Sequence, residues 1–233
     1  SCWWCHNPES QSPETETYTR QKMLDGRAHQ KENTIGYYIE ADELFEIIES
    51  DTIFFDESGG GVTFSGGEPL MQPDFLKEIA GSCKKAEIHT ALDTSGFVEQ
   101  KTLMEILPLI DLVLFDLKIM DDEMHQKYTG VSNRMILENL SMLNESGKDI
   151  HLRFPVIPGI TDTHDNIKDI TGYLQTLDQI NHIDVLPYHD ISRGKYERFG
   201  KENKLGAMQA NPGAVENIRE EFEKLGFQVH TGG

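Results

Sequence analysis

The sequence has few basic residues and few cysteines, and it contains no long apolar run. Its 233 residues include 21 Lys and Arg against 40 Asp and Glu, which gives a net charge of −19. Binding to nucleic acid requires basic side chains that displace counterions from phosphates, so this imbalance argues against a nucleic-acid partner. It argues equally against a basic anchor on an anionic membrane surface.

The apolar residues are too scattered for a membrane span, which needs about twenty of them in succession. The longest apolar stretch, residues 103–115, is interrupted by Glu105, Pro108 and Asp111. The first residues show no basic region leading into an apolar one, as a secretion signal would. Three cysteines, two of them within the first five residues, do not make a disulfide framework. We therefore expect a globular protein in the reducing cytoplasm, with no membrane partner.

From Gly61 onward, short β-branched or apolar runs alternate with longer segments of helical periodicity, which is typical of a parallel sheet covered by helices. The expected strands are Val62–Ser65, Ile88–Asp93, Leu112–Lys118, Ile150–Val156, Ile183–Tyr188 and Phe227–Thr231. The expected helices between them are Asp74–Ala86, Gln100–Leu107, Arg134–Glu145, His164–Leu177 and Pro212–Leu225. Residues 1–233 are thus expected to form one α/β domain, whose strands either close toward a barrel or spread into a doubly wound sheet.

The first sixty residues have a different pattern. The segment Glu9–Asn33 is rich in Glu, Gln, Thr and Lys and has almost no apolar periodicity, so we interpret it as a mobile excursion. A helix is expected at Ala41–Ser50, where apolar residues form a stripe. Asp42 and Glu43 favour the amino-terminal end of its dipole.

Polar side chains follow five of the expected strands at the point where each strand ends. Parallel α/β folds gather their chemistry at this edge, where loops converge and helix amino termini point. The polar runs are Ser65-Gly66-Gly67-Glu68, Asp93-Thr94-Ser95-Gly96, Asp116-Leu117-Lys118, Arg153 within His151-Leu152-Arg153-Phe154-Pro155, and His189 after Pro187-Tyr188. Together they predict a small-molecule site with groups suited to a zwitterion and a sugar hydroxyl.

Each run taken alone also has a purely structural interpretation. The Gly66-Gly67 pair is compatible with a plain tight turn, and the run that begins at Asp93 with a cap of the following helix. An acid and a base two apart on a strand, such as Asp116 and Lys118, share one face and also form structural ion pairs. It is the convergence of the five strand ends that favours a ligand site.

The segment Cys2-Trp3-Trp4-Cys5 has a spacing typical of metal binding, since thiolates so spaced bind one ion or one edge of a cluster. Structural zinc normally takes four ligands, and the third cysteine, Cys83, lies on an expected helix. A redox dithiol of the thioredoxin kind follows a strand and begins a helix, whereas this motif opens the sequence. Zinc and the dithiol are therefore the less favoured alternatives to a cluster.

These residues resemble radical S-adenosylmethionine (SAM) enzymes, and within them the glycyl radical enzyme activating enzymes of the pyruvate formate-lyase activating enzyme family. The hallmark of that family is Cys-x-x-x-Cys-x-x-Cys, whose last two cysteines match Cys2 and Cys5, with His6-Asn7-Pro8-Glu9 after them. Its first cysteine would fall before Ser1, so the sequence is expected to begin inside the motif and to lack the first strand. Further similarity covers most of the chain and runs through residues 58–69, 93–97, 116–118, 128–131, 155–159 and 186–189.

The resemblance implies a partial (β/α)6 barrel of the radical SAM type and a [4Fe-4S] cluster with Cys2 and Cys5 among its three thiolate ligands. It implies that the cluster and SAM carry the chemistry and that no side chain acts as a catalytic acid or base. The cofactor-binding positions of the family map onto Trp4, Cys5, His6, Gly66, Gly67, Glu68, Asp93, Ser95, Asp116, Leu117, Lys118, Arg153 and His189.

Within that set the resemblance also implies individual roles. Trp4 to His6 would wrap the cluster and the adenine, and Gly66 to Glu68 would hold the amino group of the methionine part. The ribose and the carboxylate would be held by Asp116, Lys118 and His189.

The implied reaction is reductive cleavage of SAM to methionine and a 5′-deoxyadenosyl radical, which takes a hydrogen atom from a glycine of a partner enzyme. Glycine suits this step because it has no side chain to block the approach. The implied partners are a glycyl radical enzyme and, as electron donor, a flavodoxin or ferredoxin. The activating enzyme is expected to be a monomer.

The sequence departs from the family in two ways. Many related activating enzymes carry a cysteine-rich insert after the first motif, whereas residues 10–35 form a polar insert without cysteine, so no auxiliary cluster is expected. With Cys2 and Cys5 alone, the chain should hold a cubane cluster poorly. Two alternatives remain: a radical SAM reaction on a small molecule, and a degenerate domain that binds SAM without turnover.

Overall fold

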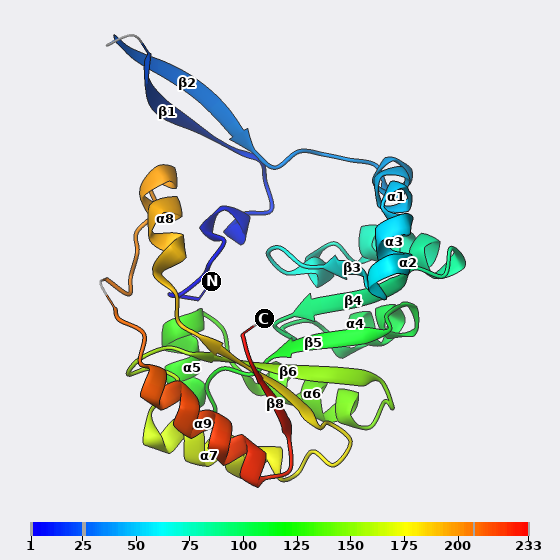
Figure 1. Ribbon diagram of the computed structural model, residues 1–233, viewed down its shortest axis with the longest axis vertical. Coiled ribbons are helices and arrows are strands. Elements are labelled where there is room, and N and C mark those ends of the chain that lie inside the picture. The colour runs from blue at the N-terminus through cyan, green and yellow to red at the C-terminus, as the bar shows by residue number, and fades with distance from the viewer. Residues whose placement is uncertain (1, 25–26, 207, 233) are drawn as a thin grey trace.

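A parallel six-stranded sheet lies at the centre of the computed structural model, which describes residues 2–24, 27–206 and 208–232 (Figure 1). Its strands are β3 (Gly61–Phe64), β4 (His89–Thr94), β5 (Leu112–Asp116), β6 (Asp149–Val156), β7 (His182–Pro187) and β8 (Gln228–Thr231). They lie side by side in the order in which they follow one another along the chain. A doubly wound sheet reverses this order partway, so the structure has the other architecture, an open partial barrel.

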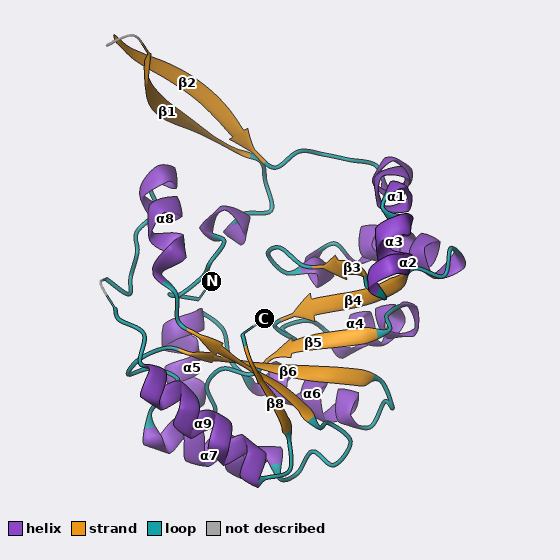
Figure 2. Ribbon diagram, in the orientation of Figure 1, coloured by secondary structure: helices purple, strands orange, loops and turns teal. Residues whose placement is uncertain are grey.

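One face of the sheet, called here the covered face, packs against helices. These helices are α3 (Pro73–Lys85), α4 (Gln100–Ile106), α6 (Arg134–Asn144), α7 (His164–Leu174) and α9 (Pro212–Lys224), shown in purple in Figure 2. The core between the two layers includes Leu92, Phe115 and Phe154, all fully buried. The ring of Phe154 meets Phe222 of α9 edge-on, with the centroids 5.7 Å apart. Apolar burial against these helices therefore holds the layers together.

The opposite face, called here the open face, carries the alternate side chains of the same strands. Parallel register places Asp116, Arg153, Asp184 and His230 in one row across β5, β6, β7 and β8. The row before it contains Leu114, His151, His182 and Gln228. The ionisable groups of these strands thus lie on the open face, whereas the large buried apolar groups lie on the covered face.

The expected strands are all present, and their bounds differ from the expected ones by two residues at most. The expected helices are also present, with α1 (Ala41–Ser50) at its expected bounds and α7 ending three residues early. Three helices of seven or eight residues were not predicted, namely α2 (Thr52–Ser58), α5 (Asp122–Thr129) and α8 (Arg193–Phe199). They are too short to display an apolar stripe over several turns. The 3-10 turns are η1 (Pro8–Gln11), η2 (Pro69–Met71), η3 (Leu107–Leu109) and η4 (Asp190–Ser192).

A β-hairpin lies where the sequence indicated no strand, within the segment interpreted as a mobile excursion. Strands β1 (Glu16–Leu24) and β2 (Arg27–Ile35) pair antiparallel and project from the body of the protein (Figure 1). The hairpin contacts α8 through Tyr18, whose ring meets that of Phe199 edge-on at 5.1 Å. Its ladder is made by backbone groups, so a polar composition without period-two apolar residues did not reveal it. Among the described residues, no helix has the length and apolar character needed to cross a membrane.

Candidate functional site

A network of charged side chains crosses the carboxyl-terminal ends of four strands. The hydroxyl of Ser65 donates to Asp93 Oδ2 at 2.8 Å, and the guanidinium of Arg153 lies 2.7 Å from the same oxygen. Arg153 Nε is also 3.5 Å from Asp116 Oδ1, and Lys118 Nζ is 3.0 Å from Asp116 Oδ2. These five residues, called here the charge network, link the ends of β3, β4, β5 and β6.

The two cations of the charge network are held in their protonated form. Burial alone would lower the pKa of Lys118, but the negative charges of the Asp116 carboxylate and of the Cys2 thiolate outweigh it and raise that pKa. Burial acts against Arg153 in the same way, and Asp116 and Asp93 raise its pKa. Two buried atoms at the centre of the network, Asp116 Oδ1 and Arg153 Nε, have no hydrogen-bond partner among the described residues. Buried polar atoms normally have one, so this part of the edge is suited to a polar ligand.

The carboxylate of Glu68 ties the end of β3 to the end of β4. Its oxygens accept hydrogen bonds from the Thr94 hydroxyl at 2.7 Å, and from the Ser95 hydroxyl and backbone N–H at 2.6 and 2.9 Å. Gly67 is packed closely here, because a Cβ at this position would lie 2.5 Å from the carbonyl oxygen of Ser10. Gly66 has a φ of +122°, which side chains rarely tolerate. The two glycines therefore let the amino-terminal segment lie against the end of β3.

That amino-terminal segment crosses the carboxyl edge of the sheet. The N–H of Cys5 donates to the carbonyl of Cys2 at 3.2 Å, which places both cysteines on one turn. The N–H of Trp3 donates to the Tyr128 carbonyl at 3.0 Å, and the two rings meet edge-on at 4.9 Å. Trp4 is 7 % exposed and packs against Ile119, Ile157, Ile160 and Tyr188. The two tryptophans therefore anchor the cysteine turn to the body of the protein.

The thiols of this turn lie beside the charge network. Burial raises the pKa of the Cys2 thiol, while the positive charge of Lys118 acts to lower it. Cys5 lies close to Tyr196. Burial is the main cause that raises the pKa of the Tyr196 hydroxyl to about 12, and the negative charge of Cys5 adds to the rise. Cys83 is buried in α3 within a separate apolar cluster, so the soft ligands at this edge are Cys2 and Cys5.

Two histidines complete the edge. Burial lowers the pKa of His6, and the neighbouring positive charges of His189, Lys195 and Arg153 lower it further. His6 is therefore neutral near pH 7 and lies among cationic groups. His189 follows β7 and is exposed at the start of η4.

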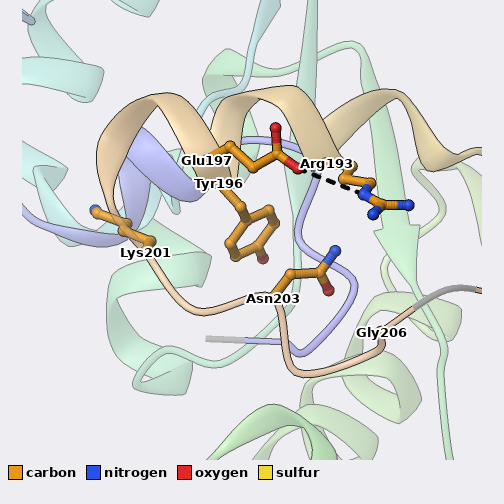
Figure 3. A pocket seen from close by; sticks show the side chains of 6 residues that line it. All are labelled: Arg193, Tyr196, Glu197, Lys201, Asn203 and Gly206. Carbon is orange, nitrogen blue, oxygen red and sulfur yellow. Dashed lines mark ion pairs between the residues drawn. The ribbon is translucent and has the colours of Figure 1, made fainter.

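Helix α8 holds the amino-terminal segment from the other side. Lys195 Nζ lies 2.6 Å from Asn7 Oδ1 and 2.9 Å from Glu9 Oε1, and Lys201 Nζ lies 2.7 Å from the Pro8 carbonyl. A pocket of about 270 Å³ opens between α8 and the loop after it (Figure 3), lined by Arg193, Tyr196, Glu197, Lys201, Asn203 and Gly206. Its lining includes no member of the charge network, so it flanks the candidate site.

The structure gathers most of the predicted site residues at one edge. Those that share contacts or electrostatic neighbours there are Cys2, Cys5, His6, Gly66, Gly67, Glu68, Asp93, Ser95, Asp116, Lys118, Arg153 and His189. The side chains of Trp4 and Leu117 lie instead in hydrophobic clusters, with Leu117 3 % exposed. The Leu117 N–H donates to the Arg153 carbonyl, so the backbone of Leu117 lies at the edge.

Four residues at this edge were not among the predicted cofactor-binding residues, namely Ser65, Thr94, Lys195 and Tyr196. Ser65 carried a signal, since it directly follows an expected strand and precedes the Gly-Gly pair. Lys195 and Tyr196 carried none, because α8 was not predicted and lies far from the cysteine motif in sequence.

Known proteins resemble this chain in sequence. The family model described as the radical SAM superfamily matches residues 1–170. The chain is 32 % identical to the trans-4-hydroxy-L-proline dehydratase activating enzyme of Clostridioides difficile, with 100 % of this chain and 90 % of that protein covered. It is 37 % identical to the choline trimethylamine-lyase activating enzyme of Oleidesulfovibrio alaskensis, covering 80 % of this chain and 62 % of that protein. It is 34 % identical to the pyruvate formate-lyase 1-activating enzyme of Escherichia coli, covering 83 % and 80 %.

Solved structures resemble it as well. A domain of the pyruvate-formate lyase-activating enzyme from Bacteroides vulgatus superposes with a TM-score of 0.63 at 32 % identity, covering 75 % of this chain and 99 % of that one. SuiB of Streptococcus suis, solved with bound S-adenosylmethionine, has a TM-score of 0.60 at 17 % identity and covers 83 % of this chain and 42 % of its own. At that identity the second likeness concerns the fold alone.

Proposed function

The chain belongs to the radical SAM superfamily, and we propose that it is the activating enzyme of a glycyl radical enzyme. Enzymes of this superfamily use a [4Fe-4S] cluster and S-adenosylmethionine, and the relatives described above are activating enzymes. When bound, the two cofactors supply reductive cleavage of SAM to a 5′-deoxyadenosyl radical, which takes a hydrogen atom from a glycine of the partner. The protein has to hold both cofactors and admit that glycine.

The observation that carries the proposal is the position of the Cys2–Cys5 turn beside the charge network. The two thiols lie on one turn, at the edge where parallel α/β proteins bind ligands. Thiolates are the usual protein ligands of iron–sulfur clusters. Asp116 Oδ1 and Arg153 Nε, which lie 3.5 Å apart without forming a hydrogen bond, belong to the same network, where a polar ligand would bond to them. The residues present therefore fit a cluster with a polar cofactor next to it.

In this proposal Cys2 and Cys5 are two of the three cysteine ligands of the cluster. Lys118 carries a positive charge next to the Cys2 thiol and favours its thiolate form. Trp3 and Trp4 fix the turn, because one is bonded to Tyr128 and the other is buried against Tyr188. Lys195 of α8 and Lys201, which follows that helix, hold the residues after the turn.

The remaining residues of the edge orient SAM. Lys118 and Arg153 provide two positive charges, and Asp93, Asp116 and Glu68 provide three negative ones. A site with both signs is suited to a sulfonium cation that carries an amino group and a carboxylate. We assign the amino group to the Gly66–Glu68 turn, and the ribose and carboxylate to Asp116, Lys118 and His189. Because Glu68 already accepts bonds from Thr94 and Ser95, its part is to hold the turn in place.

The proposed partner is a glycyl radical enzyme, and the proposed electron donor is a flavodoxin or a ferredoxin. The activating enzyme acts as a monomer in this proposal. The acidic excess of the chain, a net charge of −19, lies largely outside the balanced charges of the edge and is available to discriminate among protein partners.

The test uses the chain extended upstream of Ser1 so that the three-cysteine pattern is complete. After anaerobic reconstitution with iron and sulfide and after reduction, we expect 5′-deoxyadenosine from SAM, and a glycyl radical signal by electron paramagnetic resonance on the partner. The Cys5→Ser variant should give neither. Binding of SAM without any cleavage would favour the degenerate binding domain. Cleavage without a radical on any candidate partner would favour a small-molecule substrate.

A further inference from the structure

A second group of titratable side chains lies on the open face, at the amino-terminal ends of β6 and β7. It consists of Asp149, His151 and His182 and is called here the histidine cluster. His151 precedes Arg153 by two residues on the same strand, so the cluster lies about 7 Å along β6 from the charge network. The function proposed above uses none of its members.

Strand register brings the histidine cluster together. His151 and His182 are register partners on neighbouring parallel strands, and their rings stack with centroids 4.3 Å apart and planes 16° apart. Asp149 Oδ1 lies 3.8 Å from His151 Nε2. One ligand atom from each of the three residues lies within 4.8 Å of the others. Three potential metal ligands from two adjacent strands thus lie in one small region, and one of the two stacked rings has to turn for both lone pairs to converge on one ion.

A neighbouring residue orients the imidazole of His182. Nδ1 of His182 lies 3.0 Å from Asn181 Oδ1, which can only accept, so the proton is on Nδ1 and the lone pair is on Nε2. A hydrogen bond of this kind on the far ring nitrogen is typical of metal-binding histidines. The ring of His230 on β8 lies 6.0 Å from that of His182, and its Nδ1 is 3.7 Å from Asp184. His230 is therefore within reach as a fourth group.

We propose that Asp149, His151 and His182 bind a divalent transition-metal ion, for which Zn²⁺ is the best match. Two imidazoles and a carboxylate are a ligand set that zinc accepts, and three protein ligands leave the fourth position to water or to His230. Tetrahedral ligands at zinc distances lie about 3.4 Å from one another. The 3.8 Å between Asp149 and His151 is already close to that value. The side chain of Asp149 is 66 % exposed and free to rotate inward.

The ion would tie β6 to β7 at the end of the sheet opposite the cysteine turn. Its site differs from the cluster site in location and in ligands, and it does not depend on the proposed function. An ion that binds the folded chain and not the unfolded one raises the unfolding temperature, and the stabilisation grows with the logarithm of the free ion concentration above Kd.

The experiment is a calorimetric titration of Zn²⁺ into the Cys2→Ser/Cys5→Ser variant, in which the competing thiols are absent. We expect one ion per chain with a micromolar or tighter Kd, and a rise of about 5 °C or more in Tm at a hundredfold excess over Kd. Adding His182→Gln should weaken binding at least tenfold, and so should Asp149→Asn, an exposed change with little effect on folding. The matched control is His89→Gln, since His89 begins β4 on the same open face away from the cluster.

The outcomes are distinct. Weakening by His182→Gln and by Asp149→Asn, with no effect of His89→Gln, supports the site. No binding at 100-fold the protein concentration overturns the proposal, as does a Kd that both substitutions leave unchanged. Because the titrated chain lacks the cluster cysteines, failure of the zinc site and failure of the proposed radical function remain separate results.

Discussion

The two faces of the central sheet differ in kind, although the same strands build both. On β6, Leu152 and Phe154 are each 1 % exposed beneath the helices, whereas the side chains of His151 and Arg153 on the other face are 23 % and 25 % exposed. Successive residues of a strand point to opposite faces, so Leu152 and Phe154 face the packed core while His151 and Arg153 face the ionisable surface. The fold depends on one face and the candidate sites on the other.

This division has an energetic meaning. Apolar burial on the covered face is favourable without any partner. Ion pairs on the open face must first overcome the desolvation of both charges, so they add little net stability. The charges of the open face are therefore better explained by ligands than by folding.

The largest expected effect comes from the covered face. Phe154→Ala should lower the free energy of unfolding by about 3–5 kcal/mol, because it opens a cavity against Phe222 that the neighbouring strands cannot fill. Urea unfolding followed by circular dichroism measures the change. Phe97→Ala is the control, since Phe97 is 37 % exposed, and it should cost much less. Equal losses for both variants would contradict the assignment of stability to the covered face.

On the open face the expected effect is on binding. Lys118→Met keeps the length of the side chain and removes the charge that pairs with Asp116. In the reconstituted chain with three cysteines, its affinity for SAM should fall at least tenfold. The free energy of unfolding should also fall, by up to about 3 kcal/mol, because the part-buried Asp116 carboxylate keeps only Arg153 as a partner. Titration calorimetry and urea unfolding measure the two quantities. Lys101→Met, at a side chain that is 86 % exposed, should change neither. An unchanged affinity in Lys118→Met removes that residue from the site.

Sequence reasoning predicts the two faces unequally well. Apolar periodicity locates the strands and helices of the covered face, because burial imposes a period on the residues that pack. The charge network is predictable as a list of strand-end residues, since parallel strands end at one edge. Its internal pairing is not, because the links from Arg153 to Asp93 and to Asp116 depend on strand register.

The parts that sequence reasoning missed have no long-range pattern. The hairpin β1–β2 is stabilised by its own backbone ladder. Helix α8 is one short helix that contacts the amino-terminal segment through Lys195, and Lys201 just after it makes a further contact. The same holds for the histidine cluster. Asp149 and His151 are close in sequence, but His182 joins them through the β6–β7 register alone.

A smaller effect is expected from a histidine buried outside either face. Burial lowers the pKa of His125, although its bond to the Val131 carbonyl acts in the opposite direction. The ring is thus neutral in the folded protein, while the unfolded chain takes up a proton as the pH falls below about 6.5. Stability is then lost as the pH falls from about 6.5 toward the lower folded pKa.

The His125→Gln variant should lose less stability over that pH range, because its amide still donates to Val131 and does not titrate. Urea unfolding at a series of pH values measures the slope. His164→Gln, at an exposed position in α7, is the control and should follow the slope of the unmodified chain. A slope that His125→Gln leaves unchanged would show that other groups cause the acid sensitivity.

The smallest effect should come from an ion pair on the outer surface of the helix layer. Lys77 of α3 lies 3.4 Å from Glu105 of α4, nearly the spacing of Lys118 and Asp116, but these side chains are 53 % and 50 % exposed. Water screens the pair, so Lys77→Met should change the free energy of unfolding by about 0.5 kcal/mol or less.

A double-mutant cycle with Glu105→Gln isolates the coupling between the two charges. The matching cycle of Lys118→Met with Asp116→Asn should give the larger coupling, because that pair is 9 % and 23 % exposed and is poorly screened. Equal couplings would mean that burial does not distinguish the open face from the outer helices, and the case for the charge network as a ligand site would then rest on its geometry alone.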